Sequence, residues 1–257
     1  MVFYFTATGN SLHVARSLDK SAVSIPQALK GSSLEFSDET IGVVSPIYGG
    51  QLPYMVRDFL SRAKLHCEYL YVVLTYGMSP NVSSEIVAEL AREHGLDVQY
   101  FNTVRMVDNY LPAFDMAEQR RMDKGEEEQI ASIRADVEAR RRWWQRATPA
   151  DREVYKTYQA LVREHPDQSW ESLSFHADDS CVGCGVCVSV CPGGCIRMKG
   201  SRPSFDSAGC QKCLACVQNC PRRAIRMSLP EPNRDARYRN PHVTLEDLIA
   251  ANSQSGR

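Results

Sequence analysis

Nine of the ten cysteines lie between residues 181 and 220, and eight of these form two runs that share one spacing. Each run reads C-x2-C-x2-C-x3-C and is followed by a proline. The two runs are Cys181, Cys184, Cys187 and Cys191, and then Cys210, Cys213, Cys216 and Cys220. With this spacing, three thiolates of one loop reach three irons of a four-iron cubane, and the fourth thiolate binds the other cluster.

The spacing therefore predicts two 4Fe–4S clusters with crossed ligand sets. The first set is Cys181, Cys184, Cys187 and Cys220, and the second is Cys210, Cys213, Cys216 and Cys191. Zinc is the alternative, because C-x2-C pairs also build zinc ribbons. Zinc usually takes its four ligands as two pairs, however, and two triads that are each followed by Cys-Pro favour iron–sulfur clusters.

Two further cysteines lie outside these sets. Cys195 is four residues past Cys191. Because cysteine behaves as a small buried hydrophobe, we expect Cys195 to fill space beside a cluster. A reserve ligand or a redox-active thiol is the alternative for this residue. Cys67 stands alone before an apolar run, and we expect it to pack in the core.

The segment TATGNS, residues 6–11, joins an apolar run to a stretch with helical spacing. Backbone N–H groups and the positive end of the helix favour an anion at such a junction. The residues that would cradle a phosphate are Thr6, Thr8, Gly9, Asn10 and Ser11. The segment has no lysine, as a nucleoside triphosphate loop would, and no G-x-G-x-x-G of a dinucleotide site. It therefore predicts a phosphate site built from neutral donors.

Strands and helices in alternation must position this loop. Continuous apolar runs predict strands at 2–5, 21–25, 40–48, 69–77 and 98–107. Helical spacing of apolar residues follows three of them, at 11–18, 52–63 and 83–94. Buried strands that alternate with helices form parallel sheets covered on both faces. We therefore expect an α/β fold with a doubly wound, five-stranded parallel sheet.

Loops suited to a flat ring follow three of these strands: SPIYGG (45–50), TYGMSPN (75–81) and DNYLP (108–112). Ligands of doubly wound sheets lie at the carboxyl ends of the strands, where glycine backbone and tyrosine rings can contact a ring system. The candidate ring-binding residues are Pro46, Ile47, Tyr48, Gly49, Gly50, Thr75, Tyr76, Gly77, Asn109 and Tyr110. Tyr48, Tyr76 and Tyr110 are also candidate catalytic residues, as proton donors. Plain packing at the sheet ends is the alternative.

The rest of the chain predicts helices and a tail. Residues 123–146 are charged with one apolar face and predict a helix, and Thr148 with Pro149 begins a second helix. Thr244 and Asp247 form a capping-box-like start to a short last helix. We expect a sheet domain at 1–146, a helical linker at 147–175, a small α+β cluster domain at 176–230, and a strap with a short helix at 231–257.

Together these segments resemble a family of flavodoxin–ferredoxin fusion proteins found in anaerobic bacteria and archaea. The likeness rests on FTATGNS, GVVSPIYGG, NYLP, the two cysteine runs and RYRNPHVTLEDLIAAN. The cysteine-rich part alone resembles the bacterial two-cluster ferredoxins. The resemblance implies a flavodoxin-like domain that binds FMN and a ferredoxin domain with two 4Fe–4S clusters, and it implies little about a substrate.

This cofactor set predicts an electron-transfer protein that connects one-electron carriers with two-electron chemistry. We expect a ferredoxin-dependent reductase of a small organic acceptor, with Tyr48, Tyr76, Asn109 and Tyr110 lining the acceptor pocket. The alternative is a non-catalytic carrier between larger redox enzymes. In both cases the partner is a ferredoxin-like or other redox protein.

Composition argues against other classes. The chain has 257 residues and a net charge of −1, and no basic recognition helix points to nucleic acid. No apolar run approaches the roughly 20 residues of a membrane span, and the N-terminus lacks the positive region of a signal peptide, so we expect a cytoplasmic protein. Between residues 176 and 230, seven Lys/Arg and three Asp give a local charge of +4, which would offset the clusters or dock an acidic partner.

Overall fold

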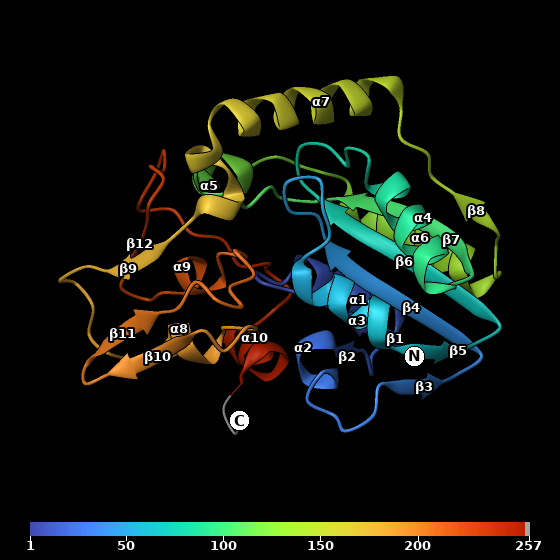
Figure 1. Cartoon of the computed structure of the whole chain (residues 1–257), viewed down its shortest axis with the longest axis horizontal. Coiled ribbons are helices and arrows are strands. Elements are labelled where there is room, and N and C mark those ends of the chain that lie inside the picture. Colours follow the sequence, from blue (N-terminus) through green and yellow to red (C-terminus); the bar gives the residue numbers. More distant parts are fainter. Residues whose placement is uncertain (255–257) are drawn as a thin grey trace.

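A parallel sheet forms the N-terminal half of the protein in the computed structural model, which describes residues 1–254 (Figure 1). Its strand order is β2-β1-β4-β6-β7-β8, and every neighbouring pair is parallel. The strands are β1 (Val2–Tyr4), β2 (Val23–Ser24), β4 (Thr40–Pro46), β6 (Tyr69–Tyr76), β7 (Val98–Arg105) and β8 (Trp143–Trp144). The first five are the predicted strands, and their order is that of flavodoxin-like doubly wound sheets.

Helices cover both faces of the sheet. On one face, α1 (Asn10–Leu18) and α6 (Glu126–Glu138) pack on a core that contains Tyr71 and Tyr100. On the other, α3 (Tyr54–Arg62) and α4 (Ser83–His94) pack on Phe3. The central strands are buried on both sides because each face carries a helical layer, which confirms the doubly wound prediction.

The helix predicted at 123–146 is shorter than expected. It ends at Glu138, and Trp143–Trp144 instead forms the sixth strand, β8, beside Tyr100 and Phe101 of β7. Trp144 stacks on Phe101 with the ring centroids 5.2 Å apart. Large aromatic residues favour a pleated surface, and this local gain outweighs the helical pattern of the charged residues before them. A small parallel pair, β3 (Glu35–Ser37) with β5 (Lys64–His66), was also not predicted.

Between the sheet and the cysteine-rich region, three short helices accompany one long helix. These are α5 (Met116–Gln119), α7 (Pro149–Glu164), and the 3-10 turns η1 (Pro166–Gln168) and η2 (Trp170–Ser172). Helix α7 begins where the sequence predicts, because Thr148 and Asp151 form a reciprocal capping box. Figure 1 shows α7 beyond the ends at which β4 and β6 terminate.

The cysteine-rich region is small and contains two antiparallel pairs and two short helices. The pairs are β9 (Phe175–Ala177) with β12 (Ile225–Met227) and β10 (Ile196–Lys199) with β11 (Arg202–Phe205). The helices are α8 (Val186–Ser189) and α9 (Ala215–Gln218), each of which starts inside one cysteine run. This arrangement is the predicted small α+β unit.

The chain then returns to the sheet. A segment that we call the strap, residues 231–243, leads to α10 (Leu245–Asn252), which packs beside α2 (Ile25–Ala28) (Figure 1). Thr244 and Asp247 form the predicted capping box of α10. Asn252 donates its side-chain amide to the Thr6 carbonyl at 2.9 Å. In residues 1–254, every helix is too short or too polar to cross a membrane.

Candidate functional site

The eight cysteines of the two runs gather around two cavities. Cys181, Cys184, Cys187 and Cys220 line the first. Cys191, Cys210, Cys213 and Cys216 line the second, together with Cys195. Each cavity combines three cysteines of one run with the fourth of the other, so the structure brings together the same two sets that the spacing predicts. Their role as ligands remains a prediction.

The two runs share a backbone path that points their thiols inward. In the first run, Gly183 and Gly185 adopt left-handed conformations, with φ of 68° and 75°. In the second run, Lys212 and Leu214 occupy the equivalent positions with φ of 51° and 62°, although neither is glycine. Left-handed backbone is costly for residues with a Cβ, so the matched conformation indicates that the loop shape itself is required.

The thiols are held in apolar surroundings. Burial raises the pKa of Cys187 to about 11 and that of Cys216 well above its ordinary value. The free thiols at these positions therefore stay protonated near neutral pH, and metal or cluster binding must release protons. Donor sets made of four thiols and no other side-chain ligand suit an iron–sulfur cluster or zinc.

Cys195 lies inside the second cavity. Its sulfur is 3.4 Å from that of Cys191, and the residue is buried. This position agrees with the expected packing role, and it also places a fifth thiol within reach of the second set. Cys67 is half-buried and packs against the core below α3 and α4.

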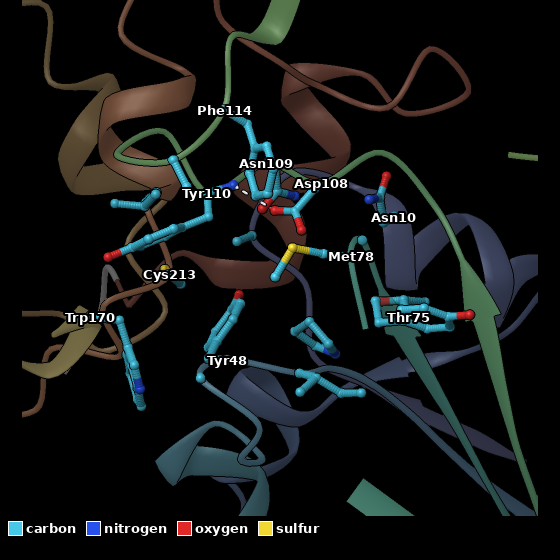
Figure 2. A pocket seen from close by; sticks show the side chains of 18 of the residues that line it. Asn10, Tyr48, Thr75, Met78, Asp108, Asn109, Tyr110, Phe114, Trp170 and Cys213 are labelled. Atoms are coloured by element: carbon cyan, nitrogen blue, oxygen red, sulfur yellow. Dashed lines mark hydrogen bonds between the residues drawn. The ribbon is translucent and has the colours of Figure 1, made fainter. Parts of the chain in front are cut away.

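A much larger pocket, of about 540 Å³, opens at the carboxyl ends of the strands (Figure 2). Every predicted cofactor residue lines it except Gly9. Gly9 has φ of 105°, and a Cβ there would lie 2.9 Å from side-chain atoms of Asn240 and Val243. The glycine is therefore needed for the close approach of the strap, whereas the sequence suggested close approach of a ligand.

One end of the pocket is built from neutral polar groups. The Ser11 and Thr75 hydroxyls are 2.8 Å apart, and the Asn10 amide donates to the Val107 carbonyl at 3.1 Å. Both contacts fix the loop at the start of α1, whose positive end faces this region. Among the described lining residues the one cation is Lys212, next to Cys213, so dipoles and hydroxyls are what would favour an anion at the α1 end.

Aromatic side chains surround the other end. Figure 2 shows Tyr48 and Asp108 on opposite sides of the space, with Tyr110 and Trp170 at one end and Asn10 at the other. Burial raises the pKa of Tyr110 to about 12 and that of Tyr48 well above its ordinary value. These hydroxyls therefore stay protonated, so they can donate hydrogen bonds or protons but cannot act as bases near neutral pH.

Several lining residues were missed from the sequence. Met78 and Asp108 lie within the predicted loops but were not singled out, and Tyr158 and Trp170 come from the segment expected to be only a linker. Asp108 is the one carboxylate among the described lining residues, and burial raises its pKa. Its Oδ1 accepts the Tyr110 backbone N–H at 3.1 Å. Asp108 could have been found from the sequence, because it is a polar residue directly after a predicted strand. No feature of the sequence around Tyr158 or Trp170 indicates that they line the pocket.

The large pocket and the second cysteine cavity share two lining residues, Cys213 and Leu214. In Figure 2, Cys213 lies at the same end of the pocket as Tyr110 and Trp170. The first cysteine cavity has no residue in common with the pocket within the described chain. The second cavity is therefore the one that adjoins the pocket.

A buried hydrogen-bond network joins the cysteine helix α9 to the pocket loops. Gln218 donates to the Asn109 carbonyl at 2.9 Å and accepts the Tyr238 backbone N–H at 2.7 Å. Asn109 in turn donates its amide to the Thr8 hydroxyl at 2.6 Å. The Tyr238 hydroxyl donates to Asn10 Oδ1, also at 2.6 Å. One glutamine thus connects the second cysteine run to both polar loops.

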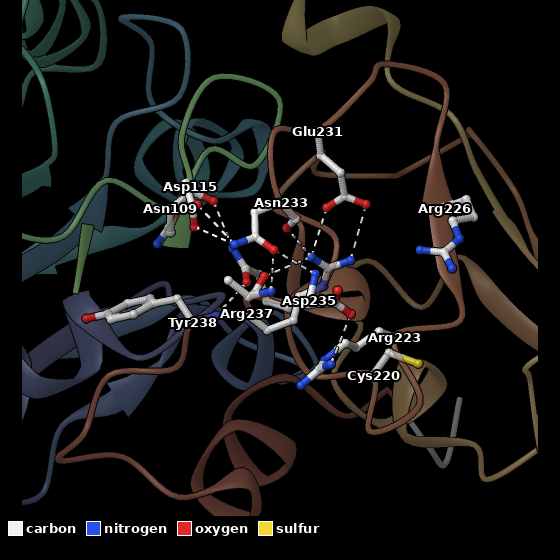
Figure 3. Close-up of polar contacts among 12 residues, drawn as sticks. Asn109, Asp115, Cys220, Arg223, Arg226, Glu231, Asn233, Asp235, Arg237 and Tyr238 are labelled. Atoms are coloured by element: carbon white, nitrogen blue, oxygen red, sulfur yellow. Dashed lines mark hydrogen bonds and ion pairs between the residues drawn. The ribbon is translucent and has the colours of Figure 1, made fainter. Parts of the chain in front are cut away.

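The strap that supplies Tyr238 is held by its own polar contacts (Figure 3). Arg237 and Glu231 form an ion pair at 2.8 Å, with only 9% and 4% of their side chains exposed. Asn233 donates to both carboxylate oxygens of Asp115 at 3.0 Å, which lowers the pKa of Asp115. Removing one partner of a buried pair leaves an uncompensated charge, so these contacts fix the path of the strap.

Comparison with known proteins bears on the cysteine-rich region. The sequence model of one family, the 4Fe-4S dicluster domain, matches residues 180–224. No curated protein matches the chain. The matched segment contains all eight cysteines of the two sets, which supports iron–sulfur clusters rather than zinc in this region. This part of the protein is a 4Fe–4S dicluster domain, which indicates an electron-transfer role.

Proposed function

We propose that the protein passes electrons between two 4Fe–4S clusters and an FMN held in the large pocket. The observation that carries this proposal is the shared lining by Cys213, which places a predicted cluster ligand at the wall of a ligand-sized pocket. A bound flavin would supply chemistry in steps of one or two electrons, whereas each cluster exchanges one.

The residues divide into those that hold the phosphate and those that hold the ring. Thr6, Thr8, Asn10 and Ser11, with the N-terminus of α1, suit a phosphate bound by neutral donors. The loops at 46–50, 75–77 and 109–110 supply backbone groups and tyrosine rings for the flat ring system. The clusters are assigned to Cys181, Cys184, Cys187 and Cys220, and to Cys191, Cys210, Cys213 and Cys216.

The cover over the pocket favours a reductase of a small organic acceptor. The Trp170 ring lies 6.1 Å from that of Tyr48, and Tyr155 of α7 accepts a hydrogen bond from Gln51 at 2.8 Å. These contacts bring the segment 149–172 over the loop at 45–50, so a flavin held there would be shielded from a large partner. Tyr48, Tyr110 and Asp108 are protonatable groups within the covered space. A ferredoxin-like protein would be the electron donor.

The second candidate is a carrier between larger redox enzymes. It rests on the exposure of the first cysteine set, where Cys184 is exposed and 62% of Val182 is accessible. An exposed set next to exposed apolar surface can exchange electrons with a protein partner. In this case the covered pocket would protect the flavin from oxygen and water and would not bind a substrate.

The first test is the cofactor content of protein purified without oxygen. We expect about one FMN, eight iron and eight acid-labile sulfide per chain, as two four-iron clusters and one flavin require. The replacement Ser11→Val should lower the flavin content and leave the iron content unchanged, because Ser11 lines the phosphate end of the pocket and is remote from the cysteines. Full iron without flavin in the wild-type protein would contradict the proposal.

Carrier and reductase differ in what reoxidises the reduced protein. For a reductase, small acceptors reoxidise the wild-type protein rapidly, and Trp170→Leu changes the apparent KM for them. For a carrier, redox proteins reoxidise it rapidly and small acceptors do not. Either outcome leaves the cofactor assignment intact, so the two experiments test separate claims.

A further inference from the structure

Three potential metal ligands from distant parts of the chain meet on the outer side of α1. They are His13 of α1, Glu127 near the start of α6, and His242 of the strap. One ligand atom from each lies within 4.8 Å of the others. The Nε2 atoms of His13 and His242 are 2.6 Å and 3.8 Å from the same carboxylate oxygen, Oε1 of Glu127.

The spacing of these atoms suits a small cation. Zinc binds imidazole nitrogen and carboxylate oxygen at about 2.0–2.2 Å, which puts tetrahedral ligand atoms about 3.3 Å apart. The two observed separations from Glu127 lie on either side of that value. The His13 and His242 rings are stacked, with centroids 4.4 Å apart and planes 15° apart, and each has its Nε2 within 4 Å of the carboxylate. To bind one ion, the His242 ring must tilt and the Glu127 carboxylate must move back slightly from His13, and both side chains are exposed enough to do so.

We infer that His13, Glu127 and His242 form a site for a divalent transition-metal ion, and we expect Zn²⁺. The bound ion would fasten the strap to α1 and α6. Two imidazoles and one carboxylate are a known zinc donor set, which leaves a fourth position for water. Imidazole nitrogen is a ligand that suits zinc and other first-row transition metals. None of the three residues lines the large pocket or a cysteine cavity, so the site is independent of the proposed flavin and cluster chemistry.

Burial distinguishes this group from an ordinary surface ion pair. Only 13% of the His13 side chain is exposed, so its ring is fixed before any ion binds, whereas Glu127 and His242 are 62% and 59% exposed and can adjust. The protein contains a natural comparison in His66 and Glu35, which form a similar contact at 2.9 Å. That pair has no third ligand nearby in the described chain, so it should not hold an ion.

The three ligands lie close to the contacts between the strap and the loop at 6–11, so a bound ion would affect both segments. His242 is two residues past Asn240, whose backbone N–H donates to the Thr8 carbonyl at 2.8 Å. His13 is three residues past Asn10, which accepts from Tyr238 and Asn240 of the strap. A bound ion would therefore hold the strap against the loop at 6–11. Because the ion binds the folded protein and not the separated segments, it also stabilises the fold by linkage.

The test uses the full chain with its iron–sulfur clusters intact, freed of other metals by brief treatment with a chelator, and titrated with Zn²⁺ in a calorimeter. We expect about one Zn²⁺ per chain, and binding at least about tenfold weaker in His242→Ala and Glu127→Gln, since even outer contacts of a metal site change affinity by that factor. The matched control His66→Ala should bind as the wild type does. Hydrogen–deuterium exchange in residues 238–243 should slow on addition of Zn²⁺ in the wild type only.

Three results would overturn the inference. The wild-type protein with intact clusters binds no Zn²⁺; His242→Ala and Glu127→Gln bind it unchanged, which would assign the ion to cysteines; or His66→Ala loses binding equally, which would indicate unspecific surface binding. Because His242 and Glu127 are exposed, both variants should fold, and retention of the cluster absorption checks that they do.

Discussion

Gln218 connects the dicluster domain to the pocket loops by hydrogen bonds. Its amide group contacts Asn109 and Tyr238 at the same time, and only 4% of the residue is exposed. Both contacts are to backbone groups: the Tyr238 N–H is buried and the Asn109 carbonyl is part-buried. A buried backbone group left without a partner costs more free energy than the hydrogen bond itself contributes.

Gln218→Leu should therefore loosen the pocket without a change in the cysteines. We expect the free energy of unfolding to fall by about 1–3 kcal/mol, since the buried Tyr238 N–H and the part-buried Asn109 carbonyl lose their partner. We also expect weaker FMN binding, because Asn109 and, through it, Thr8 are no longer held. Chemical denaturation and fluorescence titration with FMN measure the two effects.

The control for this replacement is Gln159→Leu, on the exposed face of α7. It makes the same chemical change at a position with no buried partner, and both quantities should stay at the wild-type values. Unchanged FMN affinity in Gln218→Leu, with the stability loss present, would show that the network supports the fold but does not position the pocket.

At the scale of elements, α10 fastens the end of the chain to the sheet domain. Ser24 donates to the Ala251 carbonyl at 2.5 Å, and Arg16 of α1 pairs with Asp247 at 2.6 Å. Asp247 also closes the capping box with Thr244. One carboxylate thus begins the helix and joins it to α1, so its charge state decides how firmly the strap and α10 are held.

Asp247→Asn should lower stability in a way that depends on pH. The hydrogen bond from Arg16 holds the pKa of Asp247 well below its usual range. A carboxyl group with a lowered pKa contributes stability that is complete above its ordinary pKa and is lost as the pH falls toward the lowered value. Because 42% of Arg16 and 24% of Asp247 are exposed, we expect a modest loss of about 1 kcal/mol at pH 7.

Thermal unfolding of both proteins from pH 8 to pH 4 measures this difference. It should stay constant between pH 8 and pH 5 and begin to shrink only below the ordinary titration range of a carboxyl group. Asp58→Asn is the control, because Asp58 pairs with Arg62 on the exposed face of α3 and should change stability little at any pH. A difference that already vanishes at pH 6 would contradict the assigned cause.

At the scale of the whole molecule, the sequence predicted the features that are determined by neighbouring residues in the chain. Apolar runs located five of the six strands of the main sheet, and the spacing of the cysteines predicted which four meet in each cavity. Trp143 and Trp144 were missed because their strand forms only when β7 is beside them. The cover by Tyr158 and Trp170 and the network through Gln218 were missed because their partners are distant in the sequence, as with Gln218 and Asn109.

The two cysteine cavities and the pocket follow one another across the molecule. The first set includes the exposed Cys184, and the second includes Cys213 at the pocket wall. Cys187 of the first set and Cys216 of the second are buried in the same apolar cluster, in which α8 packs against α9, so the two sets lie close together. A partner at the surface would therefore meet the first set, and the pocket would meet the second.

This order predicts that cysteine replacements in the two sets differ in their effect on the flavin. Cys213→Ser should change the visible absorption of bound FMN, because its side chain contributes to the pocket. Cys184→Ser should leave that absorption and the flavin content unchanged, although iron falls by up to about four per chain. Cys184→Ser should also slow reduction of the flavin by an external redox protein, whereas a small chemical reductant such as dithionite should reduce both variants. If Cys184→Ser disturbs the flavin absorption as strongly as Cys213→Ser does, the order is wrong.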